Sequence, residues 1–422
     1  MTSTSVLPEI EQRATTKACR FCGAELRRTF VDLGMSPLCE TYPSEAELSR
    51  GEAYYPLHVY VCEKCWLVQL EEYESAERIF SDYAYFSSFS DSWLTHCRAY
   101  ASMATERFAL SSKSMVIEVA SNDGYLLTNF VAAGIPCLGI EPAANVADSA
   151  RKKGVPTEVA FFGTDTARGL AARGLKADLL IANNVLAHVP DINDFVSGIG
   201  VLLKDDGVFT IEFPHLLNLI RELQFDTIYH EHFSYLSLLA VERIFARHAL
   251  QVFDVEELPT HGGSLRVYGC RVDGGRETSE RAPQLRAKEI EAGLDRPEGY
   301  DGFGERIERI RRELLWLVDT ARANGLKVAA YGAAAKGNTL LNYCGITREQ
   351  IAFVADRNPE KQGRLMPGSR IPIVAPEAIF AERPDYLLVL PWNLKDEVLR
   401  QNAAIRQWGG KFIIAIPEIR VD

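Results

Sequence analysis

The residues best suited to chemistry lie in one short segment, residues 225–235, which reads F-D-T-I-Y-H-E-H-F-S-Y. Histidine is scarce, with 8 in 422 residues, yet His230 and His232 flank Glu231 here. Imidazole has an ordinary pKa that lets it exchange protons at neutral pH, and a neighbouring carboxylate can orient it. The segment therefore indicates a proton-transfer site. The alternative is a polar loop or helix start whose histidines are only solvated.

The overall composition narrows the class of protein. At 422 residues the length predicts two or three domains, and 47% hydrophobic with 24% charged residues is ordinary for a globular chain. A net charge of -11 argues against a general nucleic-acid partner, which needs a basic surface. No apolar run has the length of a membrane span, and residues 1–10 lack the features of a signal peptide. We expect a cytoplasmic protein that binds neither nucleic acid nor membrane. The oligomeric state stays open, with a monomer favoured, since neither coiled-coil heptads nor an obvious interface patch is readable.

Two C-x-x-C pairs predict a structural metal site. Cys19 and Cys22 form the first pair, with a glycine following, and Cys62 and Cys65 form the second. Four thiolates give a closed tetrahedral site suited to Zn²⁺, with no open position for catalysis. So small a domain lacks core area, and the metal would provide much of its folding free energy. Buried cysteines without metal are the alternative. A redox role is disfavoured because neither pair opens a helix after a βαβ strand.

Alternating apolar strands and helical spacers from residue 115 onward predict a parallel sheet covered on both faces. A hairpin signal at Thr260-His261-Gly262-Gly263 then predicts a final antiparallel pair of strands. We expect a helix at 125–133, and strands at 115–120, 137–140, 157–162, 177–182, 207–213, 250–258 and 264–271.

Polar residues at the ends of these strands indicate a nucleoside site, because ligands of parallel sheets lie beyond the carboxyl ends of the strands. The loop after the first strand has a single glycine instead of G-x-G-x-x-G, so a bound pyrophosphate is not expected. A carboxylate ending the second strand suits a ribose diol. S-adenosylmethionine fits this pattern. Its predicted binding residues are Glu118, Asn122, Asp123, Gly124, Glu141 and Asn183.

A charged stretch from about residue 281 predicts a domain boundary, which gives domains at 1–80, 81–282 and 283–422. The last begins with an amphipathic helix at 300–324, followed by a strand at 327–332. Small residues with Lys336 at the next turn would allow close approach to phosphates at a helix N-terminus. The alternative is a purely structural half-Rossmann domain. Further strands are expected at 351–354, 386–390 and 412–416.

An aromatic cluster at residues 83–89 mixes tyrosines and phenylalanines with serines. Such a cluster could line a polar pocket, with Tyr83 and Tyr85 supplying phenols. The alternative is that it packs a junction between domains.

Five strings make the chain similar to the sugar C-methyltransferases of deoxysugar pathways. They are C-x-x-C…C-x-x-C, E-V-A-S-N-D-G-Y-L-L, N-N-V-L-A-H-V-P, E-F-P-H…F-D-T-I-Y-H-E-H-F-S-Y and G-A-A-A-K-G-N-T-L-L-N. The resemblance extends over nearly the whole chain. It implies an N-terminal zinc ribbon, a central class I (Rossmann-like) methyltransferase domain and a C-terminal Rossmann-like α/β domain.

The same resemblance implies the substrate and the roles of several residues. The family methylates nucleotide-linked keto-deoxysugars, usually carried on dTDP, in antibiotic biosynthesis. His232 matches the catalytic base, with Tyr229 and Glu231 beside it, and His188 and Tyr83 fall at active-site positions. The sugar nucleotide is expected between the middle and C-terminal domains, where Tyr85, Lys336 and Asn338 are substrate-binding candidates.

The mechanism we expect begins with removal of a proton next to a ketone by His232. The enolate carbon then takes the methyl group, and His188 or a tyrosine hydroxyl holds the oxyanion. Tyr229 instead could orient the cofactor. Rival hypotheses are an NAD-dependent sugar oxidoreductase or epimerase, a non-catalytic zinc-ribbon binding protein, and a metal bound by His230 and His232. The last is poor because metalloprotease histidines are spaced as H-E-x-x-H.

Overall fold

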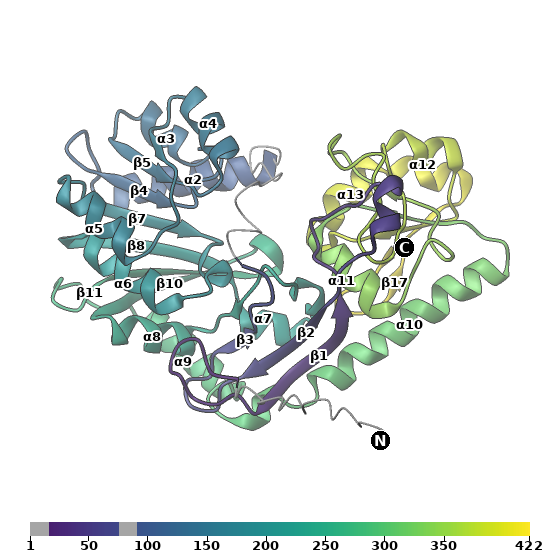
Figure 1. The fold of residues 1–422 in the computed structure, drawn as a ribbon, viewed down its shortest axis with the longest axis horizontal. Coiled ribbons are helices and arrows are strands. Elements are labelled where there is room, and N and C mark those ends of the chain that lie inside the picture. Colours follow the sequence, from purple (N-terminus) through teal and green to yellow (C-terminus); the bar gives the residue numbers. More distant parts are fainter. Residues whose placement is uncertain (1–16, 76–90) are drawn as a thin grey trace, which may run out of the picture.

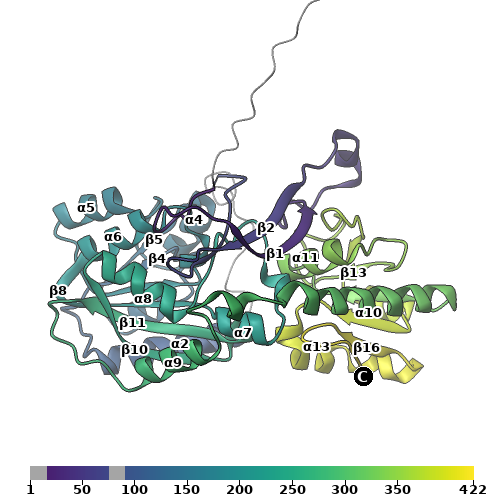
Figure 2. The same ribbon diagram turned by 90° about the horizontal axis from the view of Figure 1, so that it is seen from below.

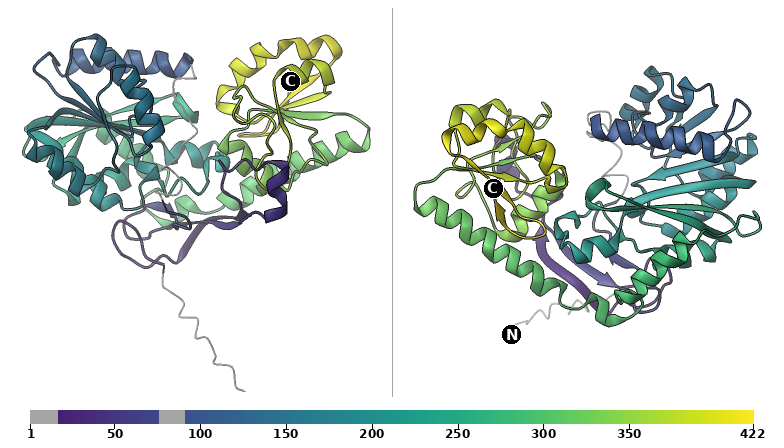
Figure 3. Two further views of the ribbon diagram at one scale, coloured as in Figure 1. Left: turned by 45° about the horizontal axis from the view of Figure 1, so that its top comes forward. Right: turned by 180° about the vertical axis from the view of Figure 1, so that it is seen from behind.

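The computed structural model describes residues 17–75 and 91–422, whose strands form three sheets. Two lobes stand side by side and are joined along their base (Figure 1). One lobe contains the central sheet and the other the C-terminal sheet, while strands from the N-terminal region run across the base between them (Figures 2 and 3). Among the described residues, we find no helix with the length and apolar character needed to cross a membrane.

The N-terminal sheet is antiparallel and has the order β1 (Arg28–Ser36), β2 (Tyr55–Val61), β3 (Val68–Leu70) and β9 (Ser234–Tyr235). The sequence predicts its first two strands, because the stretches at 31–38 and 54–62 between the cysteine pairs are apolar. The other two were not predicted, because two or three residues carry no readable periodicity. Strand β9 belongs to the 225–235 segment, which is therefore attached directly to the N-terminal sheet.

The central sheet has the order β10-β11-β8-β7-β4-β5-β6 and is parallel from β4 to β8, with β11 antiparallel to both its neighbours. The predicted parallel series with a final antiparallel pair is confirmed. The predicted third strand was too long, because residues Val159 and Phe161 beyond β6 are exposed at the sheet edge. The strands are β4 (Val116–Val119), β5 (Cys137–Ile140), β6 (Thr157–Glu158), β7 (Ala177–Asn183), β8 (Leu203–Pro214), β10 (Leu250–Leu258) and β11 (Ser264–Arg271).

Helices cover both faces of this sheet, as its nearly continuous apolar strands predict. Along β7, Leu179 and Ile181 point into one hydrophobic cluster and Leu180 points into the other. The helices of this lobe are α2 (Asp91–Arg107), α3 (Leu127–Ala132), α4 (Ala144–Lys152), α5 (Thr164–Ala172), α6 (Ile192–Leu202), α7 (Leu216–Arg221), α8 (Leu238–Arg247) and α9 (Arg281–Glu291). Short 3-10 helices lie at η3 (Leu186–His188), η4 (Phe225–Thr227) and η5 (Thr260–Gly262).

The C-terminal sheet has the order β14-β13-β12-β15-β16-β17 and is parallel except for β17. The predicted strand at 351–354 was misplaced, since Ile351 and Phe353 pack into the core outside β13. The strands are β12 (Val328–Tyr331), β13 (Val354–Ala355), β14 (Ile373–Val374), β15 (Tyr386–Val389), β16 (Lys411–Ile414) and β17 (Arg420–Val421). The helices are α10 (Phe303–Ala323), α11 (Ala335–Cys344), α12 (Glu377–Glu382) and α13 (Lys395–Gln401), with 3-10 turns η6 (Pro297–Tyr300), η7 (Trp392–Leu394) and η8 (Ala403–Trp408).

The N-terminal sheet and the C-terminal lobe share one hydrophobic core. Phe30 on β1 stacks on Phe303 of α10, with ring centroids 4.7 Å apart, and meets Tyr300 edge to face. The amphipathic face predicted for this helix includes Ile307 and Leu314, which are fully buried in the same cluster. Contacts of this kind fix the C-terminal lobe against the base of the molecule.

The charged stretch after residue 281 forms α9, which packs on the central lobe before the chain crosses to α10. Its Glu289 is buried, and its carboxylate accepts hydrogen bonds from Leu238 N at 2.7 Å and Leu239 N at 2.9 Å. The first N–H groups of a helix have no partner within the helix, so Glu289 satisfies the start of α8. His215 Nε2 lies 2.7 Å from the same carboxylate.

Replacement of Glu289 by alanine should lower the free energy of unfolding by about 2–4 kcal/mol, because it leaves these buried N–H groups without an acceptor. Urea denaturation followed by circular dichroism measures the change. Glu291→Ala is the matched control, since this exposed residue ends the same helix. Its effect should stay within about 0.5 kcal/mol. Equal losses in both variants would contradict the role of Glu289.

Candidate functional site

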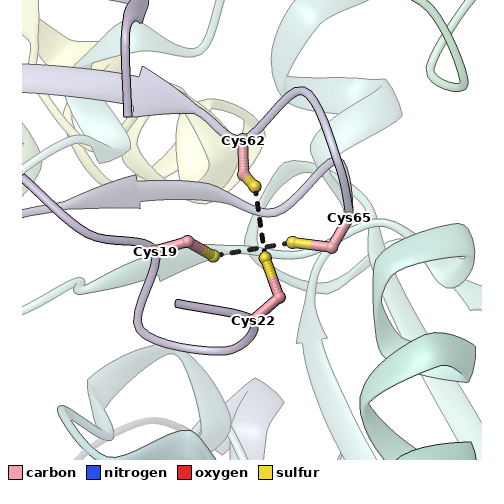
Figure 4. A group of neighbouring side chains, drawn as sticks. All are labelled: Cys19, Cys22, Cys62 and Cys65. Carbon is pink, nitrogen blue, oxygen red and sulfur yellow. Dashed lines mark hydrogen bonds between the residues drawn. The ribbon is translucent and has the colours of Figure 1, made fainter. Parts of the chain in front are cut away.

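Four cysteine sulfurs converge on one point in the N-terminal region (Figure 4). The Sγ atoms of Cys19, Cys22, Cys62 and Cys65 all lie within 4.8 Å of one another, and two of the pairs are 3.5 Å apart. Four thiolates at about 2.3 Å from a tetrahedral Zn²⁺ would be roughly 3.8 Å from each other. The predicted ligands are thus together, and this cluster is the zinc site of the chain.

Matching backbone turns bring the thiols of each pair together. Gly23 N donates to Cys19 O at 2.9 Å, and Trp66 N donates to Cys62 O at 2.8 Å. The residue after each pair takes a left-handed conformation, with φ of 71° at Gly23 and 63° at Trp66. Glycine adopts this conformation without strain, whereas tryptophan at the second turn does so at a cost. Only the first turn was recognisable from the sequence.

The zinc cluster is linked to the 225–235 segment through strand β3. Gln69, on β3, donates from Nε2 to Cys19 Sγ at 3.2 Å. Strand β3 follows the second cysteine pair, and its Val68 pairs with Tyr235 of β9. Leu70 N also donates to Phe233 O at 3.0 Å. The metal therefore fixes the strand on which the end of the segment is hydrogen-bonded.

Two predicted cofactor residues are buried carboxylates at the carboxyl edge of the central sheet. Glu141 follows β5, and its two oxygens accept hydrogen bonds from Asn122 N and Ala143 N, both at 2.9 Å. Burial raises the pKa of Glu141. Glu118 lies on the neighbouring β4, and burial together with the charge of Glu141 raises its pKa well above the ordinary value. Glu118 Oε2 has no hydrogen-bond partner among the described residues.

The loop after β4 brings further predicted residues to this edge. Asn122 has a φ of 48° and Gly124 a φ of 76°, and a Cβ at Gly124 would lie 2.9 Å from Val155. Asn183 ends β7, and its buried Oδ1 has no acceptor or donor partner within the described residues. Asp123 is different, because it forms an ion pair with Lys153 at 2.7 Å. Buried polar atoms without partners usually indicate a ligand or water, so Glu118 and Asn183 outline the site, and the carboxylate of Glu141 lies at the same edge.

His232 is buried with its tautomer fixed by the backbone. Its Nδ1 lies 2.8 Å from the carbonyl oxygen of Thr227, which can only accept a hydrogen bond. The proton is therefore assigned to Nδ1, and Nε2 carries a lone pair. Burial and the nearby His188 lower the pKa of His232 well below its ordinary value, so the ring is neutral at neutral pH. The Tyr229 ring covers it, with centroids 4.0 Å apart.

His188, from η3, meets His232 edge to face with ring centroids 4.6 Å apart. Its Nδ1 lies 2.8 Å from the carbonyl oxygen of Glu231, and burial lowers its pKa to about 4. The proton of this neutral ring is thus on Nδ1, and Nε2 can accept but not donate. The expectation that His188 donates to an oxyanion does not fit this tautomer.

His230 and Glu231, which precede His232 in the segment, have different surroundings from His232. His230 packs against the rings of Tyr55 and Tyr73, at centroid distances of 5.8 and 6.3 Å. Burial raises the pKa of Glu231 to about 8, and the charge of Glu40 adds to the increase. In an extended strand, residues two apart point to the same side, but residues 230 and 231 form a turn, so residue types alone could not distinguish the two histidines. His230 and His232 face different surroundings, which disfavours a shared metal.

The C-terminal lobe supplies Lys336 to the same region. Its ammonium donates to Asn393 Oδ1 at 3.2 Å and lies 5.0 Å from the centroid of the Trp392 ring. Trp392 Nε1 donates to Asp226 Oδ2 at 2.6 Å, which joins the lobe to the 225–235 segment. Asn338 is fully buried in α11, and its own backbone carbonyl and side-chain oxygen accept from Asn342.

Several residues of this region were given no role from the sequence. Asp226 was predicted only as part of the 225–235 segment and His261 only as part of a hairpin turn, and Trp392 lies just beyond the strand predicted at 386–390. Asp226 and Trp392 are 166 positions apart, so their pairing gives no local signal. Lys336 and Trp392, however, follow two strands of one predicted sheet, and strand ends of this kind commonly form a ligand site. Tyr83 and Tyr85 lie outside the described residues.

Family models match three consecutive parts of the chain. A zinc binding domain matches residues 19–80, a methyltransferase domain matches residues 93–255, and a C-methyltransferase C-terminal domain matches residues 259–417. The C-methyltransferase NovU of Streptomyces niveus is 37% identical over 403 residues, which cover 96% of each chain.

Solved structures similar to part of the chain include the magnesium protoporphyrin IX methyltransferase ChlM of Synechocystis PCC 6803, solved with bound SAH. It is 14% identical, with a TM-score of 0.34, over 42% of this chain and 83% of its own. An S-adenosylmethionine-dependent methyltransferase of Clostridium acetobutylicum is 12% identical, with a TM-score of 0.35, over 44% of this chain and 93% of its own.

The purified chain should contain about one zinc per molecule, and Cys62→Ser should lose most of it because three thiolates hold Zn²⁺ less tightly than four. Metal analysis by mass spectrometry provides the measurement. Cys137→Ala is the control, since this buried cysteine lies outside the cluster. Retention of full zinc by Cys62→Ser would show that the metal is bound elsewhere.

Proposed function

The chain belongs to the C-methyltransferase family, and on that premise we propose that it methylates a carbon next to the ketone of a keto-deoxysugar carried on dTDP. Bound S-adenosylmethionine supplies an electrophilic methyl group for this reaction. The residues of the chain must remove a proton from the sugar, stabilise the enolate and keep water away. A place in antibiotic or related deoxysugar biosynthesis is part of the same proposal.

The state of His232 carries this proposal. An imidazole that removes a proton from carbon must be uncharged and must present a lone pair to the substrate. Donation from Nδ1 to Thr227 O leaves Nε2 with that lone pair, and burial keeps the ring neutral. A fixed orientation also lowers the entropy cost of reaching the transition state. We therefore assign His232 as the base.

Other residues of the catalytic set support the ring of His232. Tyr229 covers one side of it, and His188 meets its edge. We propose that His188 contributes to the active site through this contact with His232. Glu231 holds His188 through its backbone carbonyl at 2.8 Å, so this residue acts by positioning. For Tyr83 we propose the catalytic role that the family resemblance implies.

We propose that the cofactor lies at the carboxyl edge of the central sheet. Each oxygen of Glu141 accepts one backbone N–H and retains a lone pair for a ribose hydroxyl. Glu118 and Asn183 offer buried acceptors for the cofactor's N–H groups. Asn122 and Gly124 shape the loop, and Asp123 supports it through Lys153.

Substrate binding is assigned to the side of the site that faces the C-terminal lobe. Lys336 supplies a half-buried ammonium there, and Asn338 supports the helix that begins beside it. Tyr85 is the third candidate. This arrangement would enclose the sugar between the two lobes.

Hydride transfer with NAD has weaker support. In the C-terminal sheet, the loop after β12 would have to receive a pyrophosphate. The carbonyl oxygen of Ala333 in that loop instead accepts hydrogen bonds from Tyr42 Oη at 2.7 Å and Lys361 Nζ at 2.9 Å. A phenol and an ammonium therefore already lie where a dinucleotide would approach the backbone.

Replacement of His232 by asparagine should lower methyl transfer at least about 100-fold, because no other group is placed to take the proton. Activity is measured with S-adenosylmethionine and a panel of dTDP-keto-deoxysugars, with products identified by mass spectrometry and NMR. Since burial lowers the pKa of His232, the wild-type rate should fall on acidification only below about pH 6.5. His248→Asn, outside the site, should retain normal turnover. Near-normal turnover of His232→Asn would overturn the assignment.

Glu141→Ala should weaken the binding of S-adenosylhomocysteine by about 10- to 100-fold, because a charge-assisted hydrogen bond to a ribose hydroxyl is lost. Isothermal calorimetry gives the affinity, and circular dichroism checks the fold. Glu158→Ala is the matched control, since Glu158 ends the neighbouring strand β6 but pairs with Arg173 at the surface. Tight binding of NAD and none of S-adenosylhomocysteine would favour the oxidoreductase.

A further inference from the structure

Enolate formation places a negative charge on an oxygen, and this charge needs a hydrogen-bond donor or a cation. The histidines that lie closest to the proposed reaction cannot supply one. The single N–H of His188 and the single N–H of His232 each donate to a backbone carbonyl oxygen at 2.8 Å. Neither histidine can therefore be the donor, and a donor from another part of the chain would meet this need.

The Trp392 side chain contacts three segments, each of which carries a polar group of the site. The ammonium of Lys336 lies 5.0 Å from its ring centroid. A Cβ at Gly262 would lie 2.4 Å from the Trp392 ring, so the turn that carries His261 is in direct contact with it. Trp392 Nε1 donates to Asp226, which precedes the Thr227 carbonyl that holds His232. The three groups thus come from different segments and share one support.

Lys336 is a cation with donors to spare. Its side chain donates to Asn393 Oδ1 at 3.2 Å, and this is its one hydrogen bond to a described residue. An ammonium has three N–H donors. Burial lowers the pKa of Lys336, and the charge of Asp226 partly offsets the decrease. A half-buried cation with free donors is well suited to an anionic partner.

His261 retains an N–H that the other two histidines have used. Asn184 Nδ2 lies 3.4 Å from its Nε2 and is a donor, so Nε2 accepts and the proton is assigned to Nδ1. Burial lowers the pKa of His261 to about 4, and the charge of Lys336 contributes, which keeps the ring neutral. Its backbone has a φ of 53°. Residues with side chains take this conformation at a cost that is often repaid at functional sites.

We propose that Lys336 and His261 form the oxyanion site of the reaction, each binding the carbonyl oxygen of the substrate. This inference rests on the proposed function. The C–H bond next to the ketone breaks, its proton goes to His232 Nε2, and its electron pair moves to the oxygen, where the ammonium and the imidazole N–H hold the charge. When the carbon has been methylated, the carbonyl forms again and His232 releases its proton to solvent.

The proposal differs from phosphate binding by Lys336, which the sequence first indicated. A phosphate ligand would bind the ammonium before and after proton removal alike, so its loss would weaken binding of the nucleotide. An oxyanion ligand acquires its charge only as the proton leaves, so its loss would slow the chemical step. The two roles therefore affect different measured quantities.

Proton removal can be measured separately from methyl transfer. The wild-type chain is incubated in D₂O with S-adenosylhomocysteine and a dTDP-keto-deoxysugar, and deuterium incorporation next to the ketone is followed by NMR. Lys336→Met should slow this exchange and methyl transfer by about 100- to 1000-fold, with binding of dTDP and of S-adenosylhomocysteine unchanged within about twofold. Lys395→Met is the control, because this exposed lysine lies in the same lobe.

His261 is tested with two variants, because the turn itself is strained. Asparagine tolerates a positive φ and keeps an N–H donor, so His261→Asn should retain more exchange than His261→Ala. The inference is overturned if Lys336→Met exchanges deuterium at the wild-type rate, or if it loses affinity for dTDP while its exchange rate is normal. A wild-type chain that neither exchanges deuterium nor transfers methyl groups to any sugar in the panel would contradict the proposed function as well.

Discussion

Burial of the 225–235 segment between the three sheets is the constraint on which the rest of the structure depends. Its peptide groups are removed from water, so they depend on hydrogen-bond partners in the protein. Phe233 O accepts from Leu70 of the N-terminal sheet, and Ile228 O accepts from Thr339 Oγ1 of α11 at 2.9 Å. Asp226 takes the indole N–H of Trp392. The segment is therefore ordered only when all three parts of the chain are in place.

Zinc acts on the site through this constraint, although its ligand set is closed. The second cysteine pair starts the turn into β3, and β3 carries β9 and hence the end of the segment. A strand of three residues has little stability by itself. Coordination of Cys62 and Cys65 fixes one end of the strand and so compensates for its short length. The metal thus contributes to the orientation of His232 without touching any reactant.

The sequence predicted those features that depend on local pattern. The bounds of β10 and β11 were predicted without error, because alternating residues and a glycine turn mark them. Cys19 to Cys65 and the strand-end Glu141 were recognisable for the same reason. The pairing of Asp226 with Trp392 was not, since it depends on how two lobes dock. Residue types alone did not separate His230 from His232, and only the family resemblance did, because their difference lies in a backbone carbonyl and the direction of each ring.

The two Rossmann-like sheets place similar groups at their edges but use them differently. Each has an acid after its second strand whose oxygens both accept backbone N–H groups: Glu141 from Asn122 and Ala143, and Asp356 from Ala333 and Asn358. Beside Glu141, the buried oxygen of Glu118 lacks a protein partner among the described residues, which is what a ligand site requires. Beside Asp356, Lys361 and Tyr42 already bind the loop. Because its nucleotide edge is filled by the chain itself, the C-terminal sheet is free to present Lys336 and Trp392 to the other lobe. One sheet is thus suited to hold a cofactor, and the other to complete the site at which the substrate reacts.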